Sequence, residues 1–276
     1  MLPRRISWGL AGAVGHIVAS LPTRGSHIFD INRRHVMEPN GLNVRLSAVY
    51  RHLLAGMTDF LHMSSRSDDK FRMLVRVTGA ENMADALSEG RGVIAITAHY
   101  SAWELIPRAV SLLGHRVGVV SRRLSHRGTS DYLDGLRARS GVDIIDRGEG
   151  IGRLMRCLRD NTAVGILIDQ DTMGVESDFV DFLGLPARTP VGPARIALRF
   201  GIPVVPLHIV RSADGSYDLV IEEKLDLSRF GSDDGHLELT GVMTERIGDW
   251  IREDPEQWAW IHERWARRPG WAPGLR

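Results

Sequence analysis

A histidine and a glutamate stand five positions apart in the segment AITAHYSAWELIP, residues 95–107. His99 follows a run of apolar, partly β-branched residues, and Glu104 falls just inside a segment of helical character. A carboxylate in the first helical turn can meet an imidazole on the preceding loop, fix its tautomer and leave the other ring nitrogen free as a base. Because an imidazole of pKa about 6.5 does not ionise an alcohol outright, such a pair removes a hydroxyl proton only while that oxygen attacks an electrophile.

The same residues also fit a purely structural interpretation. Ser101 and Glu104 have the spacing of a capping box, in which each side chain accepts a hydrogen bond from the other residue's backbone N–H. His99 would then be a partly buried polar residue whose ring is satisfied by the backbone. This interpretation needs two separate coincidences, whereas a catalytic pair explains both residues at once.

A second polar cluster ends another apolar run, in ILIDQDTMG, residues 166–174. Asp169 and Asp171, one residue apart, fit a divalent metal site of the kind found in metal-dependent sugar transferases. They fit equally well as groups that orient an arginine or a substrate hydroxyl, or as the start of a turn. The apolar residues that follow are expected to line a trough or to pack in the core: Phe179, Phe182, Leu183 and Leu185.

Several catalytic motifs are missing from the sequence. It contains no Gly-x-Ser-x-Gly elbow, no phosphate-binding Gly-x-x-x-x-Gly-Lys loop, no His-Glu-x-x-His helix and no Gly-x-Gly-x-x-Gly turn. The single cysteine, Cys157, lies among the apolar positions of an expected helix and is interpreted as a core thiol. The sequence therefore offers no obvious nucleophile for covalent catalysis.

Short apolar runs that alternate with helical segments must position these residues. We predict strands at 73–79, 92–98, 116–121, 142–146, 163–169, 203–210 and 217–223, and an amphipathic helix within 42–63. Further helices are expected at 82–89, 101–113, 130–140, 150–160 and 190–200, with two more between 236 and 264, broken at Pro255. This alternation predicts an α/β fold with one mostly parallel seven-stranded sheet covered by helices on both faces. Ligands of such sheets bind at the carboxyl ends of the strands.

The amino-terminal part differs in charge from the rest of the 276-residue chain, whose formal net charge is +1. Residues 1–51 contain seven arginines against one aspartate and one glutamate. Residues 6–22 are apolar but interrupted by three glycines, which makes them too short and too mixed for a comfortable membrane span. We expect a helical, membrane-proximal arm at 1–66, lying on a membrane surface or packed on the core at 67–276.

From about residue 70 to 268 the sequence resembles the bacterial lipid A biosynthesis acyltransferases, within the lysophospholipid acyltransferase superfamily. The resemblance rests on three segments in the same order: HYSAWE; the stretch from DQDTMG to GIPVVP; and PEQWAWIHERWARRP. It implies that His99 is the general base and that Glu104 orients it. Further polar residues at positions similar to those of the family are assigned to substrate binding: Arg122 or Arg123, Arg147, Asp169 and Asp171.

The implied reaction moves a fatty acyl chain from a thioester of acyl carrier protein or coenzyme A to a hydroxyl of a lipid or glycolipid. A thioester is a good electrophile, so this transfer needs a base and no enzyme nucleophile, metal or cofactor. The basic arm favours the acidic carrier protein as donor. The expected location is the cytoplasmic face of the inner membrane, with Trp258, Trp260 and Trp265 either at the membrane interface or packed on the domain.

Two other functions stay open at this point. A metal-dependent glycosyltransferase would use Asp169 and Asp171 to hold the metal ion and a nucleotide sugar. A non-catalytic lipid-binding module would not need His99. No nucleic-acid partner is expected, and the acceptor lipid and the acyl chain length are not encoded in any motif.

Overall fold

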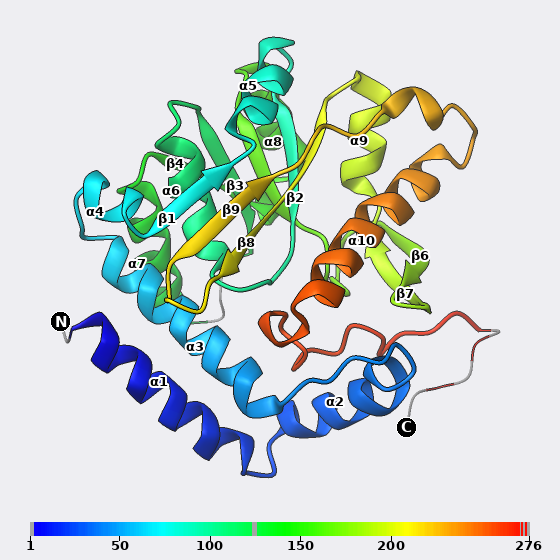
Figure 1. Cartoon of the computed structure of the whole chain (residues 1–276). Helices are drawn as coiled ribbons and strands as arrows, with labels where there is room; N and C mark the ends of the chain where they lie inside the picture. Colours follow the sequence, from blue (N-terminus) through cyan, green and yellow to red (C-terminus); the bar gives the residue numbers. More distant parts are fainter. Residues whose placement is uncertain (1–2, 123–125, 271, 273, 275–276) are drawn as a thin grey trace.

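A mixed seven-stranded sheet forms the centre of the computed structural model, which describes residues 3–122, 126–270, 272 and 274 (Figure 1). Arg123, one of the predicted substrate-binding residues, lies outside the described residues. The strand order is β1-β9-β8-β2-β5-β3-β4. The strands are β1 (Val75–Thr78), β2 (Val93–Thr97), β3 (Val117–Ser121), β4 (Val142–Asp146), β5 (Ala163–Leu167), β8 (Val204–Arg211) and β9 (Tyr217–Ile221).

All seven predicted strands form, and five of their six pairings are parallel. The exception is the antiparallel pairing of β8 with β9, so β9 and β1 run opposite to the other five strands. The prediction of a mostly parallel α/β sheet is confirmed. The carboxyl ends of β2, β5, β3 and β4 consequently share one edge of the sheet.

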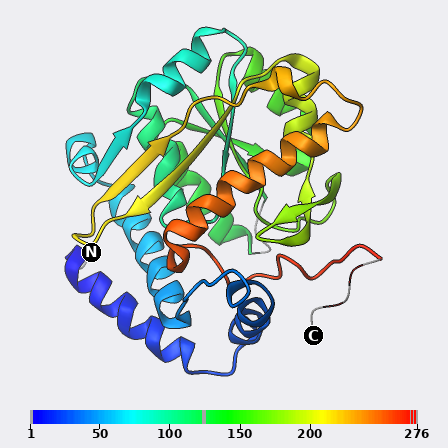
Figure 2. The ribbon, with the colours of Figure 1, turned by 45° about the vertical axis from the view of Figure 1, so that its right-hand side comes forward.

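Helices cover both faces of the sheet, as predicted. Side chains alternate between the faces along β2: Val93 and Ala95 belong to one buried cluster, and Ile94 and Ile96 to the other. Helices α5 (Ala80–Ser88), α6 (Ile106–Ser111) and α7 (Arg127–Ala138) pack on the Ala95 side. Helices α8 (Ile151–Arg159), α9 (Gly192–Phe200) and α10 (Gly235–Glu253) pack on the Ile96 side (Figure 2). Continuous apolar runs such as 93–96 fit this burial on both faces.

Two features differ from the predictions. An antiparallel hairpin of β6 (Ser177–Phe182) and β7 (Leu185–Pro190) precedes α9; the proline-rich second strand gave no clear strand pattern. The predicted second helix after Pro255 is wrong: a single 3₁₀ turn, η5 (Pro255–Gln257), leads into Trp258 in an extended conformation. Proline ends the helix, and the following residues instead pair with the loop after β2.

The described residues 3–65 form helices joined by turns, without a strand: α1 (Arg4–Ala19), α2 (Arg24–Asn32) with the π-helical turn η1 (Arg33–Met37), and α3 (Leu46–Met63). Helix α4 (Asp68–Arg72) leads into β1. Figure 1 shows α1 lying alongside α3. The buried carboxylate of Asp59 on α3 binds Arg4 and the indole of Trp8, so it ties α1 to the core. In the part of the chain that the structure describes, no helix has both the length and the apolarity that crossing a bilayer requires.

Candidate active site

His99 follows β2 at the carboxyl edge of the sheet, and its ring is held by the aspartate that follows β5. The Nδ1 atom of His99 lies 2.9 Å from Oδ1 of Asp169, and the His99 side chain is 25% exposed. β2 and β5 are adjacent parallel strands, which brings two residues 70 positions apart in the chain into contact. With the Nδ1 proton donated to the carboxylate, the lone pair of Nε2 is left available as a base.

Asp169 is fully buried, and donors hold both of its oxygens. The backbone N–H of His99 and the indole N–H of Trp258 each donate to Oδ2 at 2.9 Å. Burial alone would raise the pKa of Asp169, but the interactions with His99, His262 and Trp258 outweigh it and hold that pKa well below its usual range. The carboxylate therefore stays ionised and can stabilise a protonated His99.

A second histidine lies next to this pair. The ring of His262 is centred 6.5 Å from that of His99, and its Nε2 lies 3.2 Å from the backbone oxygen of Asp169. Burial lowers the pKa of His262 to about 4. His262 is consequently neutral at ordinary pH, and its positive charge, which also lowers the pKa of Asp169, is present only in acid.

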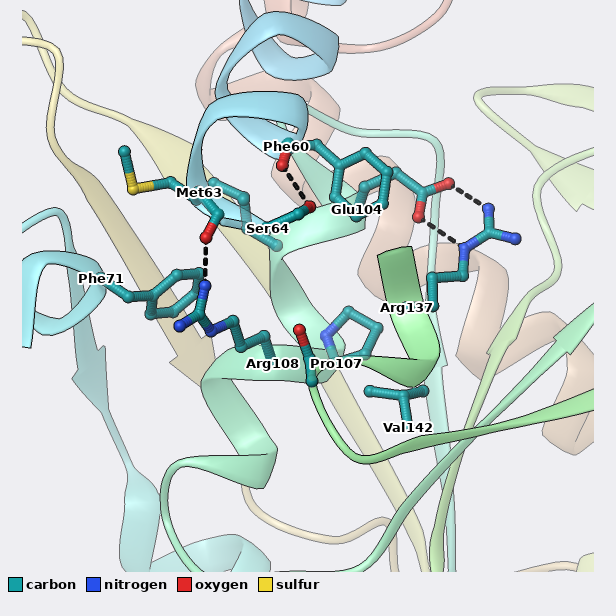
Figure 3. A pocket seen from close by; sticks show the side chains of 11 residues that line it. Phe60, Met63, Ser64, Phe71, Glu104, Pro107, Arg108, Arg137 and Val142 are labelled. Atoms are coloured by element: carbon teal, nitrogen blue, oxygen red, sulfur yellow. Dashed lines mark hydrogen bonds and ion pairs between the residues drawn. The ribbon is translucent and has the colours of Figure 1, made fainter. Parts of the chain in front are cut away.

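In the structure Glu104 pairs with Arg137 rather than with His99, so the orienting contact implied by the resemblance is not seen. The Glu104 carboxylate accepts two hydrogen bonds from Arg137 on α7, at 3.0 Å from Nε and 2.6 Å from Nη2 (Figure 3). The capping box is wrong, because Ser101 has a φ of +51° and the helix starts as a 3₁₀ turn, η2 (Trp103–Leu105). Only Trp103 of this turn meets the imidazole, edge-on with ring centres 5.1 Å apart.

A cavity of about 780 Å³ opens beside His99 and extends along both faces of the sheet. On the face covered by α6 and α7 is the long arm, lined by small or β-branched strand residues: Ala95, Thr97, Val117, Val119, Ala163 and Gly165. On the opposite face is the short arm, lined by Val120, Ile145, Leu154, Ile166, Gly192 and Ile196. Met57 on α3 and Trp103 border the same cavity.

Val119 and Val120, neighbours near the end of β3, line different arms. Strands β3 and β5 pair only from Val117 to Val119 on β3, and the last two residues of each strand are outside that pairing. The chain leaves β3 toward α7 on one face and leaves β5 toward the hairpin and α9 on the other. Such a change of direction between neighbouring strands opens a crevice at their carboxyl ends.

Two predicted substrate-binding arginines, Arg122 and Arg147, line this cavity. Burial and the positive charge of Arg122 both lower the pKa of Arg147, which donates a hydrogen bond to the backbone oxygen of Met173. Arg122 forms no ion pair with a residue that the structure describes. Two neighbouring guanidinium groups of this kind attract an anion.

Other predicted site residues have protein partners. Asp171 lines the cavity but forms ion pairs with Arg188 on β7, at 3.2 Å, and with Arg267. Since Asp169 binds His99 and Trp258, both carboxylates hold protein groups, unlike the metal ligands that the glycosyltransferase alternative requires. Among the described residues no group of three or more histidine, cysteine, aspartate or glutamate side chains is arranged to hold a metal ion.

The predicted trough residues Phe179 and Phe182 are not part of the cavity lining. Phe182 packs in the core against Trp258 and Trp265 instead, with ring centres 5.6 and 5.7 Å apart. The membrane-interface alternative for the three tryptophans is wrong as well, because Trp258, Trp260 and Trp265 are at most 2% exposed.

The segment around Trp258 has a role that sequence reasoning missed. Residues 257–259 pair with the loop that carries His99: Ser101 N–H donates to the Gln257 oxygen, and Ala259 N–H to the His99 oxygen. The three tryptophans in PEQWAWIHERW marked this segment as unusual in the sequence. They did not predict that one indole contacts Asp169.

Comparisons with known proteins agree with the earlier resemblance. Residues 1–267 match the family model described as "Bacterial lipid A biosynthesis acyltransferase". The chain is 26% identical to "Phosphatidylinositol mannoside acyltransferase" of Mycobacterium tuberculosis strain H37Rv, a match covering 70% of this chain and 61% of that protein. It is 25% identical to "Lipid A biosynthesis acyltransferase" of Haemophilus influenzae, covering 79% of this chain and 66% of that protein.

The matched regions thus span less than two thirds of these relatives' own lengths. A solved structure, the 1-acyl-sn-glycerophosphate acyltransferase PlsC of Thermotoga maritima, is 16% identical with a TM-score of 0.42, covering 93% of this chain and 99% of that one. The family match covers nearly the whole chain, whose strand-end histidine stands in the HYSAWE segment. The chain belongs to the bacterial lipid A biosynthesis acyltransferase family.

Proposed function

We propose that this protein is an O-acyltransferase that moves a fatty acyl chain from a thioester to a hydroxyl of a lipid or glycolipid. The observation that carries the proposal is the His99–Asp169 pair at the mouth of an apolar cavity arm. The names of the relatives, which are lipid A and phosphatidylinositol mannoside acyltransferases, support the same reaction class.

In the proposed step, Nε2 of His99 takes the proton of the acceptor hydroxyl while the hydroxyl oxygen bonds to the thioester carbonyl carbon. Collapse of the tetrahedral intermediate breaks the C–S bond, and the departing thiolate takes up the proton from the imidazolium. Asp169 keeps Nδ1 protonated and stabilises the positive charge that His99 carries in between. No enzyme nucleophile is needed, which fits the buried position of Cys157.

The long arm is the proposed site of the donor's acyl chain. It lies on the face toward which odd-numbered residues of β2 point, continuing from His99 past Thr97 and Ala95. It reaches Ala163, which pairs with Val93, six residues before His99; at about 3.3 Å per residue this is roughly 20 Å. One leaflet of a bilayer is about 15 Å deep, so this arm has room for a long fatty acyl chain.

The donor thioester is carried by acyl carrier protein or by coenzyme A. The basic arm favours the acidic carrier, but part of its charge is locally neutralised. Ion pairs with acidic residues involve four of the seven arginines in residues 1–51: Arg4, Arg24, Arg33 and Arg45. Parallel assays with both donors decide between them.

The acceptor is proposed to stay in a membrane, to which helix α1 attaches the enzyme from the cytoplasmic side. One side of α1 packs against α3 through Ser7, Ala11 and Gly15. The side next to it presents a stripe of apolar residues that are 46–61% exposed: Ile6, Leu10, Val14 and Ile17, continued by Leu21 just after the helix. Such a helix suits the bilayer interface better than water.

The test uses the purified full chain, acyl thioesters of both carriers and a panel of lipid A-type and phosphatidylinositol mannoside acceptors. Thiol release and mass spectrometry of the lipid product report the transfer. The wild-type protein should acylate at least one acceptor, and His99→Ala should lower the rate by at least about 10²-fold while keeping its thermal stability. Equal rates for the two proteins would refute the assigned base, and metal-dependent glycosyl transfer by the wild type would favour the sugar-transferase alternative.

A further inference from the structure

We propose that Gln257 is a positioning residue for His99. Its side-chain amide takes the place of a missing strand beside β8 and so fixes the loop that carries His99 against the sheet. Gln257 does not line the cavity, so it acts on the loop and not on a substrate. This inference rests on the proposed acyltransferase function and adds a residue on which its reaction depends.

The first observation is that β8 extends beyond its neighbour β2. Residues 94–96 of β2 lie opposite residues 204–206 of β8, and β8 continues to Arg211. Continued in the same register, Ser101 would lie opposite Arg211. The chain instead leaves the sheet after β2, and the backbone of Ser101 is left-handed, with a φ of +51°. The edge of β8 at Arg211 therefore needs a different hydrogen-bonding partner.

The side-chain amide of Gln257 is that partner. Its Oε1 accepts a hydrogen bond from the backbone N–H of Arg211 at 2.8 Å, and its Nε2 donates to the backbone oxygen of Arg211 at 3.2 Å. A residue of an antiparallel strand binds its neighbour through the same pair of bonds, one accepted and one donated. Gln257 is only 1% exposed, so water does not replace either bond.

The backbone of the same residue holds the loop of His99. The backbone oxygen of Gln257 accepts a hydrogen bond from Ser101 N–H at 2.8 Å, and Ala259 N–H donates to the backbone oxygen of His99 at 3.1 Å. A left-handed backbone is unfavourable for residues other than glycine and persists only where its surroundings fix it. Gln257 consequently joins the sheet, through its side chain, to the turn at Ser101, through its backbone.

The residue after Gln257 extends this connection to the acid that holds His99. The Trp258 indole donates to Asp169, whose other oxygen binds Nδ1 of His99. If the bonds to β8 are lost, this segment and the His99 loop are no longer fixed to the sheet. Because displacing reacting groups by about 1 Å can cost about 10²-fold in rate, the base should then work poorly in a protein that still folds.

Gln257→Glu changes the hydrogen bonds of this side chain but not its shape. A protonated carboxyl accepts from the Arg211 N–H and donates through its other oxygen, as the amide does. The ionised form has no donor, and it faces the Arg211 oxygen and the carboxylate of Asp254, whose Oδ2 lies 2.6 Å from Nε2 of Gln257. Burial and the charge of Asp254 both raise the pKa of the introduced carboxyl, so its hydrogen bonds are kept in acid and lost as pH rises.

Other charged and titratable groups lie around this position. The guanidinium of Arg211 lies over the ring of Trp8, 4.0 Å from its centre. The remaining groups near Asp254 are His52, Arg51, Tyr100, Glu253, Glu256 and Arg45. Because the wild type and the variant share all of these groups, the ratio of their kcat values isolates the introduced carboxyl.

The experiment compares the wild-type chain with Gln257→Glu and with Gln257→Met, which keeps the volume but loses every hydrogen bond of the side chain. Asn82→Asp is the matched control, because the Asn82 amide also donates to a strand oxygen, that of Ile221 on β9 at 2.9 Å. kcat and KM are measured with an acyl thioester and a lipid acceptor, and thermal unfolding records stability. Indole N–H resonances of isotope-labelled tryptophan are recorded without substrate, with that of Trp258 assigned from Trp258→Phe.

Gln257→Met should lower kcat at least about tenfold with KM unchanged, because the loop and not the cavity is altered. Gln257→Glu should stay close to the wild type in acid, and its kcat relative to the wild type should fall at least about tenfold between about pH 6 and about pH 9. In both variants the Trp258 indole resonance should move together with kcat. Asn82→Asp should lose stability but keep the wild-type kcat and an unmoved resonance.

A wild-type kcat in Gln257→Met would overturn the inference, as would an equal fall of kcat in Asn82→Asp or an unmoved Trp258 resonance in Gln257→Met. Each of these results limits Gln257 to stability. Gln257→Glu decides the question even if Gln257→Met does not fold, since a kcat equal to that of the wild type at every pH would also overturn it. If the wild type transfers no acyl group but the Trp258 resonance moves in Gln257→Met, the proposed reaction fails while the positioning stands.

Discussion

The imidazole of His99 is held by Asp169, at 2.9 Å, and not by Glu104, the acidic residue nearest to it in the expected motif. Glu104 instead joins the loop after β2 to α7 through Arg137, and Asp134 accepts a further hydrogen bond from the same guanidinium. The two carboxylates thus have separate partners: one holds the imidazole of His99, and the other holds α7, a helix that covers the long arm.

Replacing each carboxylate by its amide tests this division. Asp169→Asn should lower kcat by about 10²- to 10⁴-fold, because the amide neither fixes the Nδ1 proton nor stabilises the imidazolium. Glu104→Gln should lower kcat by less than about tenfold but reduce the free energy of unfolding by about 2 kcal/mol, since the half-buried Arg137 loses a charged partner. Steady-state kinetics and denaturant unfolding of both variants give the answer. A greater loss of kcat in Glu104→Gln than in Asp169→Asn contradicts the assignment.

Trp258 should act as a positioning residue through its hydrogen bond to Asp169. Trp258→Phe keeps an aromatic ring but removes that bond, which helps to hold the pKa of Asp169 down. Without the indole, the negative charge of the Asp169 carboxylate acts more strongly on His99 and stabilises its protonated ring. The acid limb of the pH profile of kcat/KM should therefore move to higher pH. Trp260→Phe, which loses a bond to the Pro255 oxygen, is the matched control and should leave that limb in place. Identical profiles for both variants would limit Trp258 to packing.

Gly165 should influence the length of the transferred chain. It pairs with Ala95, four residues before His99, or roughly 13 Å along the strand. Gly165→Leu should close the long arm at this level and shift preference toward acyl donors shorter by several carbons, with Gly165→Ala intermediate. Competition between thioesters of different chain lengths, read by mass spectrometry, measures the shift. A uniform loss of rate for every chain length would place the donor chain elsewhere.

Buried histidines should make the fold sensitive to acid. Burial lowers the pKa of His52, His208 and His262 from 6.5 to about 4. Between these values the unfolded chain binds more protons than the folded one, so stability rises with pH there and falls as pH drops from about 6.5 to about 4. Each group contributes roughly 3 kcal/mol to this loss.

His208→Phe isolates one of these groups, because the His208 ring already stacks on Trp250 and a phenyl ring can take its place. Unfolding free energies measured from pH 4 to 7 should show a slope smaller by about one proton in the variant. An unchanged slope would mean that His208 takes up its proton without unfolding.

The exposed stripe on α1 should bind anionic vesicles. Leu10→Glu with Val14→Glu should weaken vesicle cosedimentation at least tenfold, since each buried apolar side chain contributes about 1.5–3 kcal/mol. Gly9→Glu with His16→Glu adds the same charge at exposed positions outside the stripe and is the control. Equal losses in both pairs would point to charge repulsion rather than insertion of the stripe.

The sequence by itself determined the sheet and the position of His99 at its carboxyl edge. Apolar runs of strand length, separated by helical periods, predicted all seven sheet strands because burial on both faces leaves a strong local pattern. Parallel strands place their carboxyl ends together, so His99 and Asp169 were expected at the same edge of the sheet. That expectation needed only local information and one rule of topology.

Only the tertiary structure decided which acid meets His99. The separation of five residues favoured Glu104. In the structure, however, the backbone of Ser101 is in the left-handed region, Glu104 lies in a 3₁₀ turn, and its carboxylate pairs with Arg137. Asp169 contacts His99 instead, because β5 lies next to β2 in the sheet. These two strands are 70 residues apart in the chain, and no local sequence pattern predicts their pairing. The contact of Trp258 with that carboxylate and the end of the β3–β5 pairing at Val119 likewise depend on long-range packing, which sets side-chain directions after the elements have formed.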